Sequence, residues 1–190
     1  MPQTFESVRF KRLMSAERRK RLPPVSVLRE IGLGPGQTFV DIGAGPGFFA
    51  LPAAEIVGFS GRVYGLDVSP FMLDKLRRNA ARKNAANIRV RRIREAGVAL
   101  PAGADFYFLA NVFHEIEDKP AYLRNLRAAM AARSRLIIVD FLKKKTWGGP
   151  PLRERIPLRN MRALLAGAGF AVERVFRPNG DEYGIIARRA

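Results

Sequence analysis

One acidic residue and three glycines lie close together in the stretch FVDIGAGPGFFALPAAE, residues 39–55. The acid is Asp41, and the glycines are Gly43, Gly45 and Gly47. The stretch opens with an apolar run typical of a buried strand and continues into a segment typical of a helix. A glycine-rich turn between a strand and a helix lets the backbone approach a nucleotide-like ligand closely. We therefore expect a ligand site at this turn.

The spacing of these glycines separates one class of ligand from another. The dinucleotide fingerprint G-x-G-x-x-G needs a third glycine where this chain has Phe48, so that fingerprint is broken. Pro46 also removes one N–H group that could hold a phosphate. The Asp41 carboxylate would repel a pyrophosphate and attract an ammonium group. A ligand with a cationic amino-acid end, a ribose and a base satisfies all three observations, and S-adenosylmethionine is such a ligand.

A second acid follows the next predicted strand. Asp67 lies 20 residues after Gly47, at the tip of that strand. A carboxylate there can accept hydrogen bonds from both hydroxyl groups of a ribose. Sites for NAD bind the ribose with an acid in the same position, so Asp67 alone does not distinguish NAD from S-adenosylmethionine. Asp41 and the glycine spacing do distinguish them.

The elements that position these residues alternate between strand and helix. We expect strands at 38–43, 61–68, 87–93, 104–112 and 134–141, helices at 46–57, 69–84, 119–132 and 156–169, and a closing antiparallel pair at 170–177 and 182–189. Ser69 as N-cap, with Pro70 at the first helical position, marks one helix start. This alternation predicts a single-domain, doubly wound α/β sheet over residues 31–190. Residues 1–30 are interpreted as a helical or loop extension and a candidate lid over the site.

Composition excludes several kinds of site. The chain has no cysteine and one histidine, which excludes disulfides, cysteine nucleophiles and zinc sites built from cysteine and histidine, and no acidic cluster suggests another metal. No apolar run approaches the roughly 20 residues of a membrane span. The N-terminus lacks the apolar core of a secretory signal, so we expect a cytoplasmic protein.

The net charge of +17 raises nucleic acid as a partner. The charge comes from 26 arginines and 8 lysines that are spread along the chain. The chain has no room for a separate RNA-binding module. We therefore expect any binding to nucleic acid to be nonspecific, through phosphate contacts.

Several segments resemble a known family. VDIGAGPG and VYGLDVSPFML look like motifs I and II of the class I (Rossmann-like) S-adenosylmethionine-dependent methyltransferases, and the likeness continues through NVFHEIEDK, RLIIVDF and LLAGAGFAVERV, over residues 35–187. Within that family, these segments resemble the branch called ubiquinone/menaquinone-biosynthesis-like or methyltransferase type 11. The resemblance implies a seven-stranded, mostly parallel sheet whose last strand is antiparallel. The chain departs from the family at MAARSRL, where relatives carry a Pro-Gly-Gly turn.

The resemblance also implies roles for individual residues. The residues it assigns to the cofactor are Asp41, Gly43, Ala44, Gly45 and Gly47 at the methionine end, Asp67 at the ribose, Val68 and Met72 against the adenine, Glu95 and Ala96 at the adenine edge, and Asn111 beside the methionine carboxyl and the methyl group.

The chemistry demands little from side chains, because the sulfonium already carries an activated methyl group. The protein must align the acceptor with the S–CH₃ bond. A base is needed only when the acceptor is protonated at the working pH. His114 and Glu115 are the candidate catalytic residues, since they follow the fourth strand. The alternatives are that His114 packs the following loop and that Glu115 is a solvated loop acid.

Four functions are compatible with these observations. The first is a methyltransferase acting on a small-molecule acceptor. The second is an RNA or protein methyltransferase, favoured by the charge, although no NPPY or DPPY follows the fourth strand. The third is a non-catalytic binder that keeps the fold. The fourth is a dehydrogenase, which Asp41 and the broken fingerprint disfavour.

Overall fold

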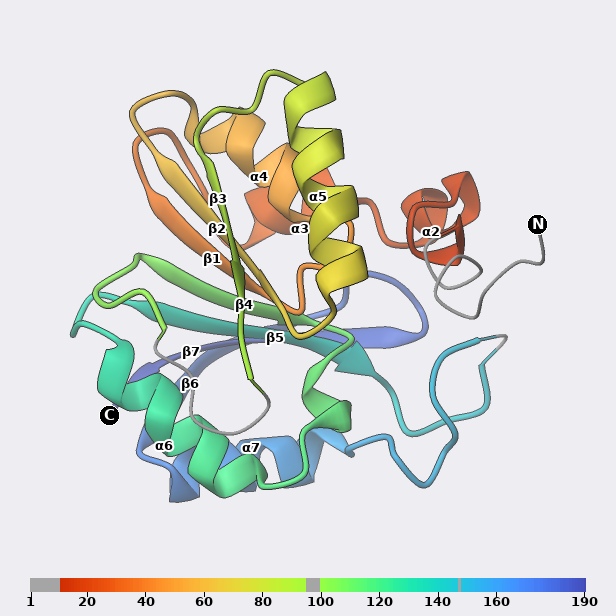
Figure 1. The fold of residues 1–190 in the computed structure, drawn as a ribbon. Coiled ribbons are helices and arrows are strands. Elements are labelled where there is room, and N and C mark those ends of the chain that lie inside the picture. Colours follow the sequence, from red (N-terminus) through yellow and green to blue (C-terminus); the bar gives the residue numbers. More distant parts are fainter. Residues whose placement is uncertain (1–10, 95–99, 147) are drawn as a thin grey trace. The chain divides into compact units, whose positions relative to one another are not determined.

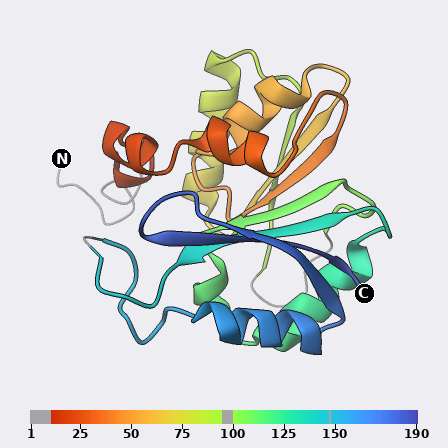
Figure 2. The same ribbon diagram turned by 180° about the vertical axis from the view of Figure 1, so that it is seen from behind.

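The computed structural model describes residues 11–94, 100–146 and 148–190. The chain divides into two compact units, residues 1–93 and 94–190, and each has its own set of strands and helices (Figures 1 and 2). In the described ranges no helix is both long and apolar enough to cross a membrane.

The first unit is built around three parallel strands in the order β3-β2-β1. Its elements are α2 (Ala16–Arg21), α3 (Pro24–Glu30), β1 (Thr38–Ile42), α4 (Ala50–Val57), β2 (Arg62–Asp67), α5 (Pro70–Arg82) and β3 (Ile88–Arg92). Strand β1 is buried over four of its five residues, as expected for a parallel strand covered on both faces. The Ser69 hydroxyl accepts a hydrogen bond from the Met72 N–H at 3.3 Å, so the predicted start of α5 is confirmed.

The helix expected from residue 46 begins later. Residues 46–49 form turns, and α4 starts at Ala50. Gly47 has φ = +97°, a conformation that a right-handed helix excludes and that glycine adopts without strain. The glycine that makes the turn therefore delays the helix.

The second unit contains four strands in the order β4-β5-β7-β6, of which β7 is antiparallel to both of its neighbours. Its elements are β4 (Phe106–Ala110), the 3₁₀ turn η1 (Phe113–Glu115), α6 (Lys119–Ala129), β5 (Arg135–Phe141), α7 (Leu158–Gly167), β6 (Phe170–Phe176) and β7 (Glu182–Arg189). Helices α6 and α7 contact each other and lie on the same side of these strands in both views (Figures 1 and 2). The predicted antiparallel pair at the end of the chain is confirmed.

The turn before β5, where the resemblance implied a Pro-Gly-Gly sequence, is held by side-chain hydrogen bonds. The Ser134 hydroxyl accepts from the Ala131 N–H at 3.0 Å and donates to the Ala104 carbonyl. Ser134 is fully buried. A serine can close such a turn through its hydroxyl, so the turn needs no glycine.

Candidate functional site

The turn after β1 is held by hydrogen bonds to the end of β2. The N–H groups of Gly43 and Ala44 both donate to the Leu66 carbonyl, at 2.8 and 2.9 Å. All three glycines of the turn have positive φ: +72° at Gly43, +53° at Gly45 and +97° at Gly47. A Cβ added at Gly47 would lie 2.6 Å from Leu76 Cδ1. The spacing 43-45-47 is thus required by backbone conformation, and at Gly47 also by packing.

Asp67 ties this turn to the tip of β2. Its Oδ2 accepts a hydrogen bond from the Gly45 N–H at 2.8 Å, and its Oδ1 accepts one from the Ser69 N–H at 2.9 Å. Each carboxylate oxygen can accept about two hydrogen bonds. Both oxygens therefore keep capacity for a further donor, such as a ribose hydroxyl, after they have fixed the glycine turn and the start of α5.

Asp41 is buried beside this turn, with 3% of its surface exposed. Its Oδ2 has no hydrogen-bond partner among the described residues. Burial raises the pKa of Asp41 to about 7, and the charge of Asp67 adds to the rise, whereas a hydrogen bond from the Ala50 backbone and the charge of Arg18 act in the opposite direction. A buried carboxylate oxygen without a donor is unusual, and a ligand cation is one kind of group that satisfies it.

The two residues expected to pack an adenine differ in accessibility. Val68 is 41% exposed, whereas Met72 is buried at 4%. The Val68 side chain is therefore open to a ligand from solvent, and Met72 belongs to the packed side of α5. The expected contacts of Glu95 and Ala96 lie outside the described residues.

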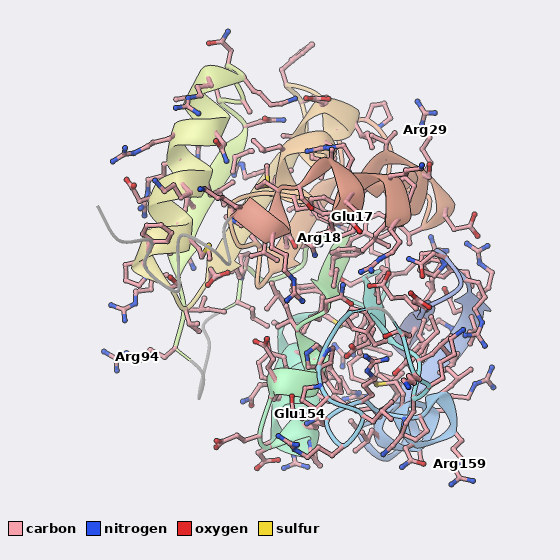
Figure 3. The ribbon with its side chains drawn as sticks, turned by 90° about the vertical axis from the view of Figure 1, so that its right-hand side faces the viewer. Glu17, Arg18, Arg29, Arg94, Glu154 and Arg159 are labelled. Carbon is pink, nitrogen blue, oxygen red and sulfur yellow. The ribbon has the colours of Figure 1, made fainter. Side chains whose placement is uncertain are left out.

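Helix α2 and Leu13, which precedes it, pack on the glycine turn. A Cβ at Gly45 would lie 3.7 Å from Leu13 Cδ1, and the Arg18 guanidinium lies 4.1 Å from the centre of the Phe48 ring. Figure 3 labels Arg18 beside Glu17 on α2. The motifs did not predict a role for Arg18, because it belongs to the extension and not to a glycine or acid pattern.

In the second unit, β4 is followed directly by Asn111, whose backbone conformation is uncommon. Asn111 has φ = +59°, a left-handed conformation that asparagine tolerates better than most residues. Its Nδ2 donates to Glu182 Oε1 at 2.6 Å, and Glu182 is 1% exposed. Its Oδ1 is buried and has no partner within the described part of the chain. Asn111 also ends the strand that was expected to run to residue 112.

His114 is paired with Asp140, the acid near the end of β5. The imidazole Nδ1 lies 2.8 Å from Asp140 Oδ1, and the His114 N–H donates to Asp140 Oδ2 at 3.1 Å. The two side chains are 5% and 1% exposed. Burial opposes protonation of the imidazole, but the hydrogen bond and charge of Asp140, with the charges of Glu115 and Glu154, outweigh burial and raise the pKa of His114.

This pairing sets the tautomer of His114. A carboxylate at Nδ1 favours a proton on that nitrogen and leaves the lone pair on Nε2, where a base can act. Glu115, the other catalytic candidate, is exposed and has no comparable burial. The sequence signal for Asp140 was available, since an acid inside the apolar run LIIVDF is out of place unless it is paired.

A buried arginine organises the loop after β5. Arg155 is 5% exposed and donates to the carbonyls of Pro150, Leu142, Lys144 and Gly148, at 2.7 to 3.2 Å. Its guanidinium also lies 5.1 Å from the centre of the Phe141 ring. Sequence reasoning missed this residue because one arginine among many carries no pattern.

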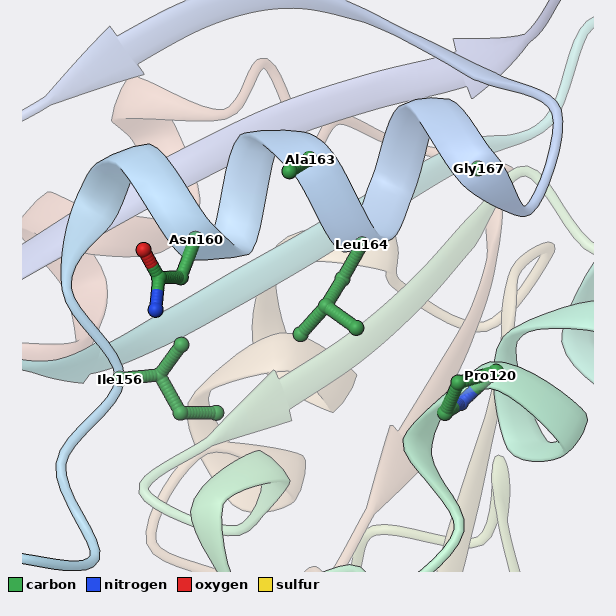
Figure 4. A pocket seen from close by; sticks show the side chains of 6 residues that line it. All are labelled: Pro120, Ile156, Asn160, Ala163, Leu164 and Gly167. Atoms are coloured by element: carbon green, nitrogen blue, oxygen red, sulfur yellow. The ribbon is translucent and has the colours of Figure 1, made fainter.

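A separate pocket of about 520 Å³ lies between α6 and α7 (Figure 4). The residues that line it are Pro120, Ile156, Asn160, Ala163, Leu164 and Gly167. This lining contains one amide and no acid, base or nucleophile. The pocket therefore lacks the groups that catalysis needs.

The chain was compared with known families, proteins and structures. A family model described as "Methyltransferase domain" matches residues 33–163. The crystal structure of an S-adenosylmethionine-dependent methyltransferase from Aquifex aeolicus superposes with a TM-score of 0.91 and 29% identity, over 98% of this chain and 100% of that chain.

Two curated proteins are similar in sequence. The ribosomal protein L11 methyltransferase of Thermus thermophilus is 34% identical over 138 residues, which are 73% of this chain and 47% of that protein. The O-demethylpuromycin-O-methyltransferase of Streptomyces alboniger is 33% identical over 165 residues, 75% of this chain and 42% of that protein. The chain thus spans less than half the length of these two relatives.

These comparisons agree with the strands and turns described above. The predicted fold, a doubly wound seven-stranded sheet that is mostly parallel and has an antiparallel last strand, is confirmed. The family model covers the glycine turn, Asp67 and the His114 turn. The chain therefore belongs to the class I S-adenosylmethionine-dependent methyltransferases.

Proposed function

We propose that this domain transfers the methyl group of S-adenosylmethionine to a hydroxyl oxygen of a small molecule, with His114 as the general base. The observation that carries the proposal is the buried His114–Asp140 pair, with its 2.8 Å contact at Nδ1. A hydroxyl is a poor nucleophile until its proton is removed, so an oriented imidazole suits such an acceptor. Several similar proteins are named as O-methyltransferases, which supports this choice.

The residues of the first unit suit the cofactor. The orphaned Asp41 Oδ2 would receive the ammonium group, the backbone of Gly43, Ala44, Gly45 and Gly47 would approach the methionine portion, and Asp67 would accept the ribose hydroxyls. When bound, the cofactor supplies the activated methyl group. The chain's own part is to hold its two ends and to exclude water.

The residues of the second unit would serve the acceptor. In this proposal His114 takes the hydroxyl proton at Nε2, while Asp140 holds the ring and stabilises its charged form. Asn111 would lie beside the methionine carboxyl and the methyl group, its side chain fixed by Glu182. Glu115 remains a second, weaker candidate because its side chain is exposed.

The remaining assignments follow from the same reading. Val68 would cover the adenine from its exposed position, while Met72, Glu95 and Ala96 stay predictions. Residues 1–30 would act as a lid and residues 31–190 as the methyltransferase domain. A cytoplasmic location and membership of the ubiquinone/menaquinone-like branch also stay predictions.

A second candidate function is favoured by the distribution of charge. Residues 70–94 carry nine arginines and lysines and one aspartate, a net charge of +8 out of +17, and most of these side chains are exposed on α5 and β3. The charge is therefore less dispersed than expected. A basic face of this kind suits RNA, so an RNA or protein acceptor is the alternative.

One experiment separates these functions. Cell extract is divided into a small-molecule fraction and a macromolecular fraction, and each is incubated with methyl-labelled S-adenosylmethionine, with and without nuclease or protease. We expect label to enter the small-molecule fraction. Label that appears in a nuclease-sensitive or protease-sensitive form would establish the alternative. Binding of S-adenosylhomocysteine by calorimetry without any label transfer would make the domain a non-catalytic binder, and binding of NAD alone would contradict both proposals.

A further inference from the structure

Arg18 is held in place directly over the glycine turn of the first unit. Its backbone N–H donates to the Ser15 hydroxyl at 3.1 Å, and its Nη1 donates to the Leu13 carbonyl at 3.0 Å. Its guanidinium lies 4.1 Å from the centre of the Phe48 ring. Two side-chain contacts and a capped helix thus restrict a side chain that is normally mobile.

Its neighbours on α2 are placed differently. Arg19 and Lys20 are exposed, whereas Arg18 is half-buried. The Arg19 guanidinium is more distant from Phe48, at 5.5 Å. Arg18 thus makes the closer contact with the turn, Arg19 and Lys20 belong to the solvated face, and Arg21 is half-buried like Arg18.

The turn then carries two opposite charges within the same unit. Asp41, whose Oδ2 has no partner among the described residues, is buried beside the same turn, and the charge of Arg18 lowers its pKa. An anion and a cation at one turn are complementary to an amino-acid zwitterion, which carries an ammonium and a carboxylate on one carbon.

We infer that Arg18 binds the α-carboxylate of the methionine end of the cofactor, so that the extension forms part of the cofactor site. The inference rests on the proposed function and adds a residue from outside the family motifs. A guanidinium suits this task, because its planar fork donates two parallel hydrogen bonds to a carboxylate while its face stays stacked on an aromatic ring.

The test compares ligands that differ only at the amino-acid end. Calorimetry measures the binding of S-adenosylhomocysteine and of 5′-methylthioadenosine, which lacks the amino acid, to the wild type, to Arg18→Gln and to Arg19→Gln. We expect Arg18→Gln to bind S-adenosylhomocysteine about 10- to 100-fold more weakly, the range for a charged hydrogen bond, and to bind 5′-methylthioadenosine as the wild type does. Arg19→Gln is the matched control, with the same charge change on the same helix, and should behave like the wild type.

Each other outcome has a defined meaning. Equal losses for both ligands would mean that Arg18 only props the turn, and an unchanged affinity for S-adenosylhomocysteine would also overturn the inference. If Arg18→Gln does not fold, the wild type decides the question with decarboxylated S-adenosylmethionine: an affinity equal to that for S-adenosylmethionine overturns the inference, and a similar 10- to 100-fold deficit supports it. A wild type that binds none of these ligands would instead refute the proposed function.

Discussion

The turn after β1 and the turn after β4 are both held at a strand end, but by different means. In the first unit, the turn rests on backbone hydrogen bonds to Leu66 and on glycines whose missing side chains make room. In the second, Asn111 and His114 rest on the buried acids Glu182 and Asp140. A turn built from glycines is destabilised when a side chain is added to it. A buried polar network is destabilised when one of its side chains is removed.

Removal of the histidine should have the largest effect. His114→Gln should lower kcat by about 10²- to 10⁴-fold, the usual contribution of a general base, and leave S-adenosylhomocysteine binding unchanged. Initial rates with the acceptor found by the labelling experiment measure this. Glu115→Gln serves as the control and should stay within about twofold of wild type, since no buried pair is lost. A similar loss of kcat in both variants would show that His114 is not the general base.

The next effect concerns Asp67, whose carboxylate braces the backbone turn at Gly45. Asp67→Ala should cost about 2–4 kcal/mol of S-adenosylhomocysteine affinity, because two hydrogen bonds to a charged group are lost. It should also lower the melting temperature, since the N–H groups of Gly45 and Ser69 lose their acceptor. Asp74→Ala, which removes an equal charge from the partly exposed pair with Arg78, should change neither. Calorimetry and thermal melts decide the matter, and unchanged affinity in Asp67→Ala would exclude the ribose assignment.

Adding a methyl group at Gly47 tests whether the turn after β1 depends on a missing side chain. Gly47→Ala should lower the free energy of unfolding by about 2–4 kcal/mol, from overpacking against Leu76 and from its positive φ. Gly58 has φ = +67° and nothing within 4 Å of the added Cβ, so Gly58→Ala should lose only about 1–2 kcal/mol. Urea denaturation measures both. Equal losses would show that packing at the turn contributes nothing beyond backbone strain.

The smallest effect is a shift in pH dependence. Burial opposes protonation of His114, but Asp140 outweighs it, so the pKa stays above 6.5 and the rate should rise with pH through a midpoint above 6.5. The charged pair stabilises the fold below pH 6.5, and this contribution should be lost as pH rises through the folded pKa. Asp140→Asn should move the midpoint of the rate profile downward. A midpoint that does not move would mean that Asp140 does not control the proton on His114.

Much of the first unit could be predicted because its site depends on local rules. Glycine spacing, the Ser69 cap and an acid at a strand tip are all visible in short windows of sequence. The partners of Asn111 and His114 could not be found in this way. Asn111 and Glu182 are 71 residues apart, and β7 brings Glu182 into register opposite Phe141 only when the sheet has formed.

The role of Arg155 was also beyond a local reading. Its four carbonyl acceptors lie in an irregular loop, whose path no periodicity describes. The same holds for Arg18, whose contact with Phe48 joins the extension to the turn. In a chain with 26 arginines, the few that are buried differ from the rest by their surroundings and not by their sequence pattern.

Strand β7 has a consequence for how the second unit is made. It follows β6 in the chain but lies between β5 and β6 in the sheet. In the order of synthesis, β5 and β6 are therefore made before the strand that lies between them, and each has an unpaired edge until β7 pairs with it. Glu182 and Tyr183, which flank the site, arrive with that strand. We expect Glu182, the support of Asn111, to be among the last parts of this unit to become ordered.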